Sequence, residues 1–170
     1  SARVSQGEFD AVKKITDWAA QHNLLDKIEV LTFVDGNTSV EWMEKAGAKV
    51  MNLLTKGSLN HLKHQLKKSP EQHFEEVANT ISLAKAKGMK VNVYLEDWSN
   101  SIRNSKEYVF QFLDFLKNQP IERVLLPDTL GILIPSEVKE FISELVSRYP
   151  HTHFDFHAHN DYDLGTANAL

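Results

Sequence analysis

The sequence has no cysteine among its 170 residues, which excludes a disulfide framework and thiolate metal sites. Their absence is compatible with a cytoplasmic protein. No apolar run approaches the roughly 18 residues that a membrane-spanning helix needs, so we expect no membrane partner. The first residues, from Ser1 to Val4, do not resemble a signal peptide.

An excess of positive charge is also missing. The chain has 19 Lys and Arg against 23 Asp and Glu, a formal net charge of −4, so we expect no nucleic-acid partner. No low-complexity segment or linker rich in Pro, Gly or Ser divides the chain. With 42% hydrophobic residues, the chain can form one domain or a part of one.

Short runs rich in β-branched residues alternate with longer amphipathic segments. This alternation predicts strands joined by helices, which is typical of a parallel sheet. We expect strands at residues 28–33, 49–54, 89–95, 121–126 and 152–157. We expect helices at residues 8–21, 38–46, 70–87, 104–117 and 135–149, and a further helix beginning near residue 164.

Two capping boxes mark expected helix starts. Thr38 would be an N-cap with Glu41 at the third helical position, and Ser69 would pair with Gln72 in the same way. Gly47 is placed to end the first of these helices in a left-handed conformation. These signals fix where the helices between the strands begin and end.

Parallel sheets of this kind form either a (β/α)8 TIM barrel or a doubly wound open sheet. The sequence predicts five strands, whereas a TIM barrel needs eight. The chain also starts directly before a helix and stops within one. We therefore expect residues 1–170 to be a single partial TIM-barrel domain that lacks the first and last strands, with the doubly wound fold as the alternative.

The last expected strand ends in a pair of histidines. His157 and His159 are two residues apart, so they point to the same face where the strand ends. Two neutral imidazoles at this spacing can take neighbouring positions around one divalent ion. The motif is short, and two exposed or hydrogen-bonded histidines are an equally good interpretation.

Two other strand ends are polar. Tyr94 and Glu96 share a face, and a carboxylate at this place can act as a base, a metal ligand or an orienting group. Asp97 beside it can instead cap the following segment. Thr129 can hydrogen-bond a substrate carboxylate, but Asp128 and its neighbours also have turn-forming chemistry.

The other histidines show no partner pattern, and we interpret them as surface residues. They are His22, His61, His64, His73 and His151. The lysine-rich stretch 56–68 can meet the phosphates of CoA, but a solvated helix face explains it at least as well.

The string from His157 to Asn168, HAHNDYDLGTAN, resembles the signature of the 2-isopropylmalate, homocitrate and citramalate synthases. These enzymes are TIM-barrel metalloenzymes, and hydroxymethylglutaryl-CoA lyase belongs to the same superfamily. Supporting strings are NLLT at 52–55, NVYLE at 92–96 and LPDTLG at 126–131. The resemblance extends over essentially the whole chain.

The resemblance implies condensation of acetyl-CoA with a 2-oxo acid on a divalent ion (Mn, Mg or Zn), in branched-chain amino-acid biosynthesis. It implies that His157 and His159 are metal ligands and that Glu96 belongs to the group that moves protons and orients water. It implies that Thr129 holds the carboxylate of the 2-oxo acid. The full-length enzyme is expected to be a homodimer.

The resemblance also places Leu31, Leu54 and Tyr94 in the wall around the substrate's variable side chain. Leu54 and Tyr94 are larger or less polar than the usual residues of isopropylmalate synthases. Large groups would leave room for a methyl group and crowd an isopropyl group. This favours pyruvate as the acceptor and citramalate as the product, although one methylene discriminates by only about 1–3 kcal/mol.

The sequence departs from the family pattern because the Arg-Asp-Gly motif of the first strand is absent, and with it an expected metal-binding Asp. We therefore expect the 170-residue chain to be inactive by itself. The alternatives are 2-isopropylmalate synthase, a carbon–carbon lyase, a metal hydrolase that uses the two histidines, and a non-catalytic truncated barrel.

Overall fold

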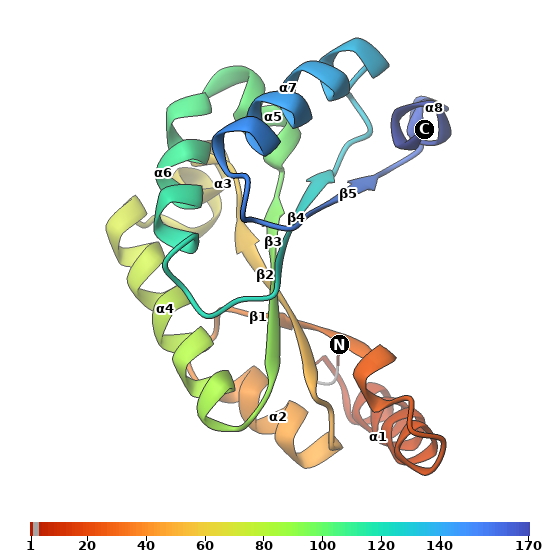
Figure 1. Cartoon of the computed structure of the whole chain (residues 1–170). Coiled ribbons are helices and arrows are strands. Elements are labelled where there is room, and N and C mark those ends of the chain that lie inside the picture. Colours follow the sequence, from red (N-terminus) through yellow and green to blue (C-terminus); the bar gives the residue numbers. More distant parts are fainter. Residues whose placement is uncertain (2–3) are drawn as a thin grey trace. The chain divides into compact units, whose positions relative to one another are not determined.

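The computed structural model describes residues 1 and 4–170, and in it strands and helices alternate as the sequence predicts (Figure 1). The strands are β1 (Glu29–Phe33), β2 (Val50–Lys56), β3 (Lys90–Glu96), β4 (Arg123–Asp128) and β5 (Phe154–Ala158). The α-helices are α1 (Gln6–Gln21), α2 (Thr38–Ala46), α3 (Leu59–His61), α4 (Pro70–Ala86), α5 (Trp98–Asn104), α6 (Lys106–Leu116), α7 (Pro135–Arg148) and α8 (Gly165–Ala169). A 3-10 turn, η1 (Leu25–Lys27), and a π-helical turn, η2 (Leu62–Leu66), complete the described elements.

The five strands form one sheet in the order β1-β2-β3-β4-β5. β1 is parallel to β2, with Phe33 opposite Leu54, and β4 is parallel to β5, with Pro127 opposite His157. Sequential order without a reversal is the order of a TIM barrel, whereas a doubly wound sheet reverses at its switch point. The prediction of a partial TIM barrel is confirmed, and the doubly wound alternative is wrong.

The described chain divides into two compact units. One contains residues 1–55, 74–93 and 119–122, and the other contains residues 56–73, 94–118 and 123–170. β2 and β3 contribute residues to both units. The ends of β2 and β3, with all of β4 and β5, therefore belong to the second unit, and so does every candidate site residue except Leu31 and Leu54.

The first unit contains α1, α2, β1, most of α4 and the first parts of β2 and β3. The rings of Phe9 and Trp42 meet edge to face, with centroids 5.3 Å apart, and join α1 to α2. A row of polar side chains links three strands: the buried Asn92 amide donates to Oδ1 of the buried Asn52 (2.8 Å), and the Asn52 amide donates to Oε2 of the exposed Glu29 (3.0 Å). Because buried polar groups need partners, these hydrogen bonds favour one register of the three strands.

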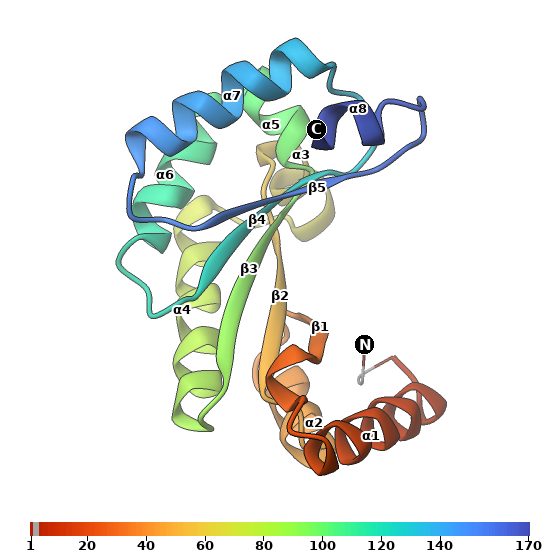
Figure 2. The same ribbon diagram turned by 45° about the vertical axis from the view of Figure 1, so that its right-hand side comes forward.

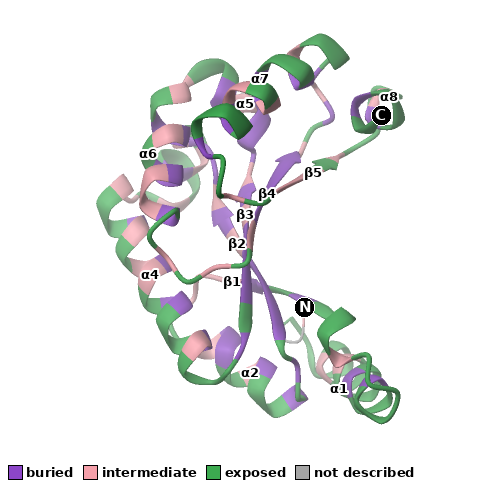
Figure 3. Cartoon of the chain, viewed as in Figure 1, coloured by how far each residue is buried: buried purple, intermediate pink, exposed green. Residues whose placement is uncertain are grey.

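The second unit has a large apolar core, with the side chains of Trp98, Phe112 and Leu126 fully buried. Ion pairs between Arg103 and Glu137 and between Lys106 and Glu144 attach α7 to α5 and α6. Figure 3 shows β4 almost wholly buried, whereas β5 is half-buried or exposed along its length. Figure 2 shows β5 beside β4, with α8 following it.

One predicted capping box is confirmed and the other is wrong. Gln72 N–H donates to Ser69 Oγ (3.3 Å), and Ser69 N–H donates to Gln72 Oε1 (3.0 Å), as predicted for the start of α4. At α2 the N-cap is Asn37, and Thr38 is already helical. The side-chain amide of Asn37 donates a hydrogen bond to the Glu41 carboxylate. Glu41 therefore pairs with the residue before Thr38 and not with Thr38 itself.

The predicted helix over residues 104–117 is confirmed as α6, which runs from Lys106 to Leu116, and a short helix that was not predicted, α5, precedes it. α5 ends at Asn104, and Ser105 has an extended φ of −152° before α6 begins at Lys106. α5 has seven residues, of which only Trp98 and Ile102 are large and apolar. This is too few to show a helical period in the sequence. No helix within residues 1 and 4–170 has both the length and the apolar character needed to span a membrane.

Gly57 follows the last residue of β2 and lies against the backbone of β3. Its N–H donates to the Glu96 carbonyl (2.8 Å). A Cβ atom at this position would collide with the Leu95 carbonyl, which is backbone and cannot rotate away. Glycine is therefore required here by the close approach of two strand ends rather than by an unusual φ.

We predict that Gly57→Ala lowers the free energy of unfolding by about 1–3 kcal/mol, because overpacking against backbone forces the strands apart. Gly7→Ala is the matched control, since a Cβ there meets nothing closer than Ser5 Oγ at 3.9 Å. Urea unfolding of the purified protein measures both. A Gly57→Ala protein as stable as the control would contradict the close approach.

Candidate active site

The end of β3 carries two predicted site residues on one face of the sheet. Tyr94 and Glu96 are two residues apart and partly exposed, whereas Val93 and Leu95 between and before them are fully buried. A ring and a carboxylate thus stand together at the C-terminal end of a parallel strand. Ligands bind at this end in TIM barrels.

Glu96 has a partner that the sequence did not reveal. The Lys56 ammonium group at the end of β2 forms an ion pair with Glu96 Oε2. We grouped Lys56 with the lysine-rich stretch 56–68 and expected a solvated face. The predicted strand ended at residue 54, whereas β2 extends to Lys56 beside a strand that ends in Glu96.

His157 and His159 are together at the end of β5, as predicted. Their rings stack with centroids 5.0 Å apart and an interplanar angle of 27°. The Tyr94 ring meets the His157 ring edge to face, with centroids 6.0 Å apart. Burial, and then the charge of His159, lower the pKa of His157 from its ordinary value. Because imidazole must be neutral to bind a metal, this direction favours the ligand form of His157.

The two histidines make an incomplete donor set. Within residues 1 and 4–170 the structure contains no group of three or more His, Asp or Glu side chains arranged to hold a metal ion. Asp161 Oδ2 lies 3.9 Å from His159 Nδ1, which is too far for a hydrogen bond, and it does not complete the donor set. The donor chemistry fits a divalent ion, provided that further ligands come from outside these residues.

Thr129 lies directly after β4 and is connected to the end of β3. Its Oγ1 accepts a hydrogen bond from the Asp97 N–H (2.9 Å). A hydroxyl that accepts one hydrogen bond still has its own proton to donate. The geometry therefore leaves Thr129 able to bind an anionic group at the same edge of the sheet as Glu96.

Asp128 has a structural role, as its turn chemistry indicated. It is fully buried, and its carboxylate accepts hydrogen bonds from the N–H groups of Ile132 (3.0 Å) and Leu133 (2.9 Å). These bonds close the loop after β4 and fix the position of Thr129 within it. Gly131, in the left-handed region with φ of 63°, completes the turn.

The two asparagine side chains of the string from His157 to Asn168 form hydrogen bonds with backbone groups. Asn160 Oδ1 accepts from the Gly165 N–H (2.9 Å) at the start of α8. The buried Asn168 amide donates to the Leu133 carbonyl (2.7 Å) and attaches α8 to the loop after β4. Two residues of the signature therefore stabilise the loops on either side of the histidines.

Two histidines that we interpreted as surface residues are not exposed, so that prediction is wrong for them. His73 is 1% exposed, and its Nε2 accepts from the Lys56 N–H (3.1 Å). His61 Nε2 lies 3.5 Å from Oδ2 of the buried Asp97, whose other oxygen accepts from Asn100 (2.6 Å). Asp97 occupies the N-cap position of α5, but its side chain makes no capping bond to the helix backbone.

The three residues predicted to form the substrate wall belong to two different compact units. Tyr94 contacts His157, as reported above, whereas Leu31 on β1 and Leu54 on β2 belong to the first compact unit. Leu31 is 38% exposed and Leu54 is half-buried. Their grouping with Tyr94 around one substrate stays a prediction.

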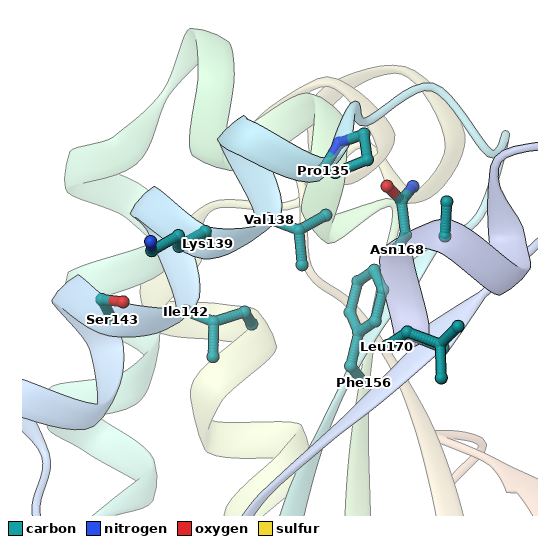
Figure 4. A pocket seen from close by; sticks show the side chains of 10 residues that line it. Pro135, Val138, Lys139, Ile142, Ser143, Phe156, Asn168 and Leu170 are labelled. Atoms are coloured by element: carbon teal, nitrogen blue, oxygen red, sulfur yellow. The ribbon is translucent and has the colours of Figure 1, made fainter.

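A pocket of about 620 Å³ lies between α7 and α8 (Figure 4). Its walls include Val138, Ile142 and Phe156, and Asn168 lies at one side with its Oδ1 buried and without a hydrogen-bond partner. Lys139 is its single titratable side chain. Because acid–base chemistry needs convergent titratable groups, this pocket is not the candidate active site.

Homocitrate synthases are among the curated relatives of this chain. A homocitrate synthase from Saccharolobus islandicus is 40% identical over 110 residues, which cover 65% of this chain and 23% of that enzyme. A homocitrate synthase from Sulfolobus acidocaldarius is 34% identical over the same coverage. The chain thus spans about a quarter of the length of these curated relatives.

The fold has solved counterparts. The crystal structure of hydroxymethylglutaryl-CoA lyase from Pseudomonas aeruginosa matches with a TM-score of 0.68 and 16% identity, over 91% of this chain and 56% of that one. At this identity the match shows the fold alone. The HMGL-like family matches all of residues 1–170. This match covers the ends of β3, β4 and β5 with their polar side chains, and the chain belongs to the HMGL-like family.

Proposed function

We propose that the protein carrying this chain condenses acetyl-CoA with a 2-oxo acid in a metal-dependent reaction. Its family contains metal-dependent enzymes of the acetyl-CoA condensation and lyase types. The observation that carries the proposal is the group formed by the stacked His157 and His159 with Tyr94, on the strand end that also holds Glu96. The relatives named homocitrate synthases favour condensation over cleavage.

His157 and His159 would hold one divalent ion, Mn, Mg or Zn, with further ligands from outside residues 1–170. When bound, the ion supplies Lewis-acid polarisation of the keto group of the 2-oxo acid. Two imidazoles occupy only part of a coordination shell, so they leave positions for substrate and water. Tyr94 restricts the His157 ring from one side, which helps to keep the two imidazoles in place.

Thr129 and Glu96 act on the substrates. The Thr129 hydroxyl donates its free proton to the carboxylate of the 2-oxo acid and orients the keto group. Glu96 takes part in proton transfer and in orienting water: the acetyl methyl group loses a proton, its carbon attacks the keto carbon, and water then hydrolyses the thioester. The products are free CoA and a 2-hydroxy dicarboxylic acid, or a tricarboxylic acid from an acceptor with a second carboxylate.

We further propose pyruvate as the acceptor, which would make the product citramalate and place the reaction in isoleucine biosynthesis. The support is the size of three side chains, Leu31, Leu54 and Tyr94. Apolar walls suit a methyl group, whereas 2-oxoglutarate, the acceptor that would give homocitrate, needs a partner for its second carboxylate.

We predict that the full-length protein releases free CoA from acetyl-CoA fastest with pyruvate and only when Mn²⁺ is present. The measurement is thiol release with pyruvate, 2-oxoisovalerate or 2-oxoglutarate, each with and without metal, and with hydroxymethylglutaryl-CoA alone. Preference for another 2-oxo acid would keep condensation and discard the size argument. Cleavage of hydroxymethylglutaryl-CoA, or no consumption of acetyl-CoA, would refute condensation.

We predict that His157→Ala and His159→Ala each weaken Mn²⁺ binding by at least about tenfold, because each removes one ligand. Titration of Mn²⁺ into the full-length protein, followed by calorimetry, measures this. His151→Ala is the control, since His151 is exposed and precedes the start of β5, whereas His157 and His159 lie at its end. Equal affinities in all three variants would show that the ion binds elsewhere.

We predict that Leu54→Ala shifts acceptor preference from pyruvate towards 2-oxoisovalerate by about tenfold in the ratio of kcat/KM values, since one or two methylenes in an apolar pocket are worth roughly this much. Leu83→Ala is a matched control, because Leu83 is a 41% exposed leucine on α4. An unchanged ratio for Leu54→Ala would remove Leu54 from the substrate wall.

A further inference from the structure

We propose that Lys56 is a positioning residue for Glu96, holding one carboxylate oxygen so that the other faces the reacting groups. This inference rests on the proposed role of Glu96 in the condensation. Neither the sequence signature nor the expected site included Lys56.

The pair is shielded from solvent. The exposed fraction of the side chain is 19% for Lys56 and 24% for Glu96. Ion pairs at the surface are mobile and screened, and many of them contribute nothing measurable. Screening is weaker for a partly buried pair, so the ammonium group can restrict the direction of the carboxylate.

The backbone of Lys56 is held on both sides by buried side chains. Its N–H donates to His73 Nε2 (3.1 Å) on α4, and its carbonyl accepts from the Tyr108 hydroxyl (2.8 Å) on α6. Burial raises the pKa of Tyr108, so this phenol keeps the proton that it donates. The His73 ring also packs against Phe112, with centroids 5.6 Å apart. The position from which the Lys56 side chain starts is therefore fixed by two helices.

Glu96 is fixed from the same direction. The Gly57 N–H donates to the Glu96 carbonyl (2.8 Å), and no side chain fits between Gly57 and Leu95. The two strand ends are thus joined twice, by a backbone hydrogen bond and by the ion pair between Lys56 and Glu96. A lysine side chain loses less conformational entropy on forming an ion pair when its backbone is already ordered.

This arrangement divides the carboxylate between two tasks. Lys56 occupies Oε2 of Glu96, and the second oxygen has lone pairs left for a proton, a water or a substrate hydroxyl. Proton transfer needs heavy atoms within hydrogen-bond reach and correct direction, which a freely rotating carboxylate provides only part of the time. Lys56 therefore acts on the reaction through Glu96.

Lys56 also differs from the lysines that follow it. Lys63 and Lys67 are exposed, and Lys67 is in the left-handed region with φ of 55° at the end of the π-helical turn. Those side chains face solvent, where CoA phosphates are one possible partner. Lys56 has its ammonium group on a carboxylate, so we assign it to positioning and not to CoA binding.

The test is a double-mutant cycle in the full-length protein, with kcat and the KM for acetyl-CoA measured for Lys56→Met, Glu96→Gln and the double variant. Removing an acid–base group lowers kcat by about 10²–10⁴-fold, and losing its orienting partner is expected to lower it by about 10–100-fold. If Lys56 acts through Glu96, adding Lys56→Met to Glu96→Gln changes kcat by less than about threefold. The KM for acetyl-CoA should stay the same in Lys56→Met.

Two further variants separate positioning from folding. Lys56→Arg keeps the charge and should recover most of the kcat that Lys56→Met loses. Lys106→Met is the matched control, because Lys106 also forms an ion pair, with Glu144 at 2.8 Å, but away from the site. Its kcat should equal that of the wild type, and thermal unfolding of every variant shows whether the fold is kept. If Lys56→Met does not fold, Lys56→Gln replaces it in the cycle.

The inference would be overturned if the two losses of kcat multiplied in the double variant. It would also be overturned if Lys56→Met raised the KM for acetyl-CoA in the Glu96→Gln background. In either case Lys56 would act on the substrate directly. Failure of Lys56→Arg to recover activity while it remains folded would overturn it as well. A wild-type protein that does not consume acetyl-CoA would instead refute the proposed function, and the positioning role with it.

Discussion

The close approach of β2 to β3 at Gly57 is the constraint on which the candidate site depends. Because no side chain separates Gly57 from the Leu95 carbonyl, the ends of the two strands lie within hydrogen-bond distance. This brings Lys56 to Glu96 and leaves the backbone of Lys56 within reach of His73 and Tyr108. The carboxylate is thus placed by strand ends, which are more rigid than loops.

Polar side chains hold the loops that carry Thr129 and His159 through hydrogen bonds to backbone groups. Asp128 closes the first loop, Asn160 holds the start of α8, and Asn168 joins α8 to the first loop. Since buried polar groups must be satisfied, each of these side chains replaces a missing backbone partner. Part of the family signature therefore supports the site instead of forming it.

Sequence periodicity was sufficient to predict the five strands, because buried parallel strands read as short β-branched runs. Local capping chemistry was sufficient at Ser69, where the partner is three residues away, and insufficient at Thr38, where Asn37 took the cap. The burial of His73 and the pairing of Lys56 depend on contacts between residues 17 and 40 positions apart. Contacts between residues so far apart produce no periodic pattern in the sequence. We therefore interpreted both residues as solvated.

Tyr94 lies between the residues of two proposed functions, metal binding and proton transfer, and is for that reason a poor probe of either. Its ring contacts His157, and two residues further along the same face Glu96 carries the carboxylate. Truncating Tyr94 would enlarge the space proposed for the substrate, but it would also free the His157 ring and change the surroundings of the proposed metal ligands. A changed acceptor preference in such a variant would have two causes that kinetics cannot separate. Leu54 is an aliphatic side chain on another strand, β2, and has no ring that could stack on an imidazole, so acceptor size is better tested there.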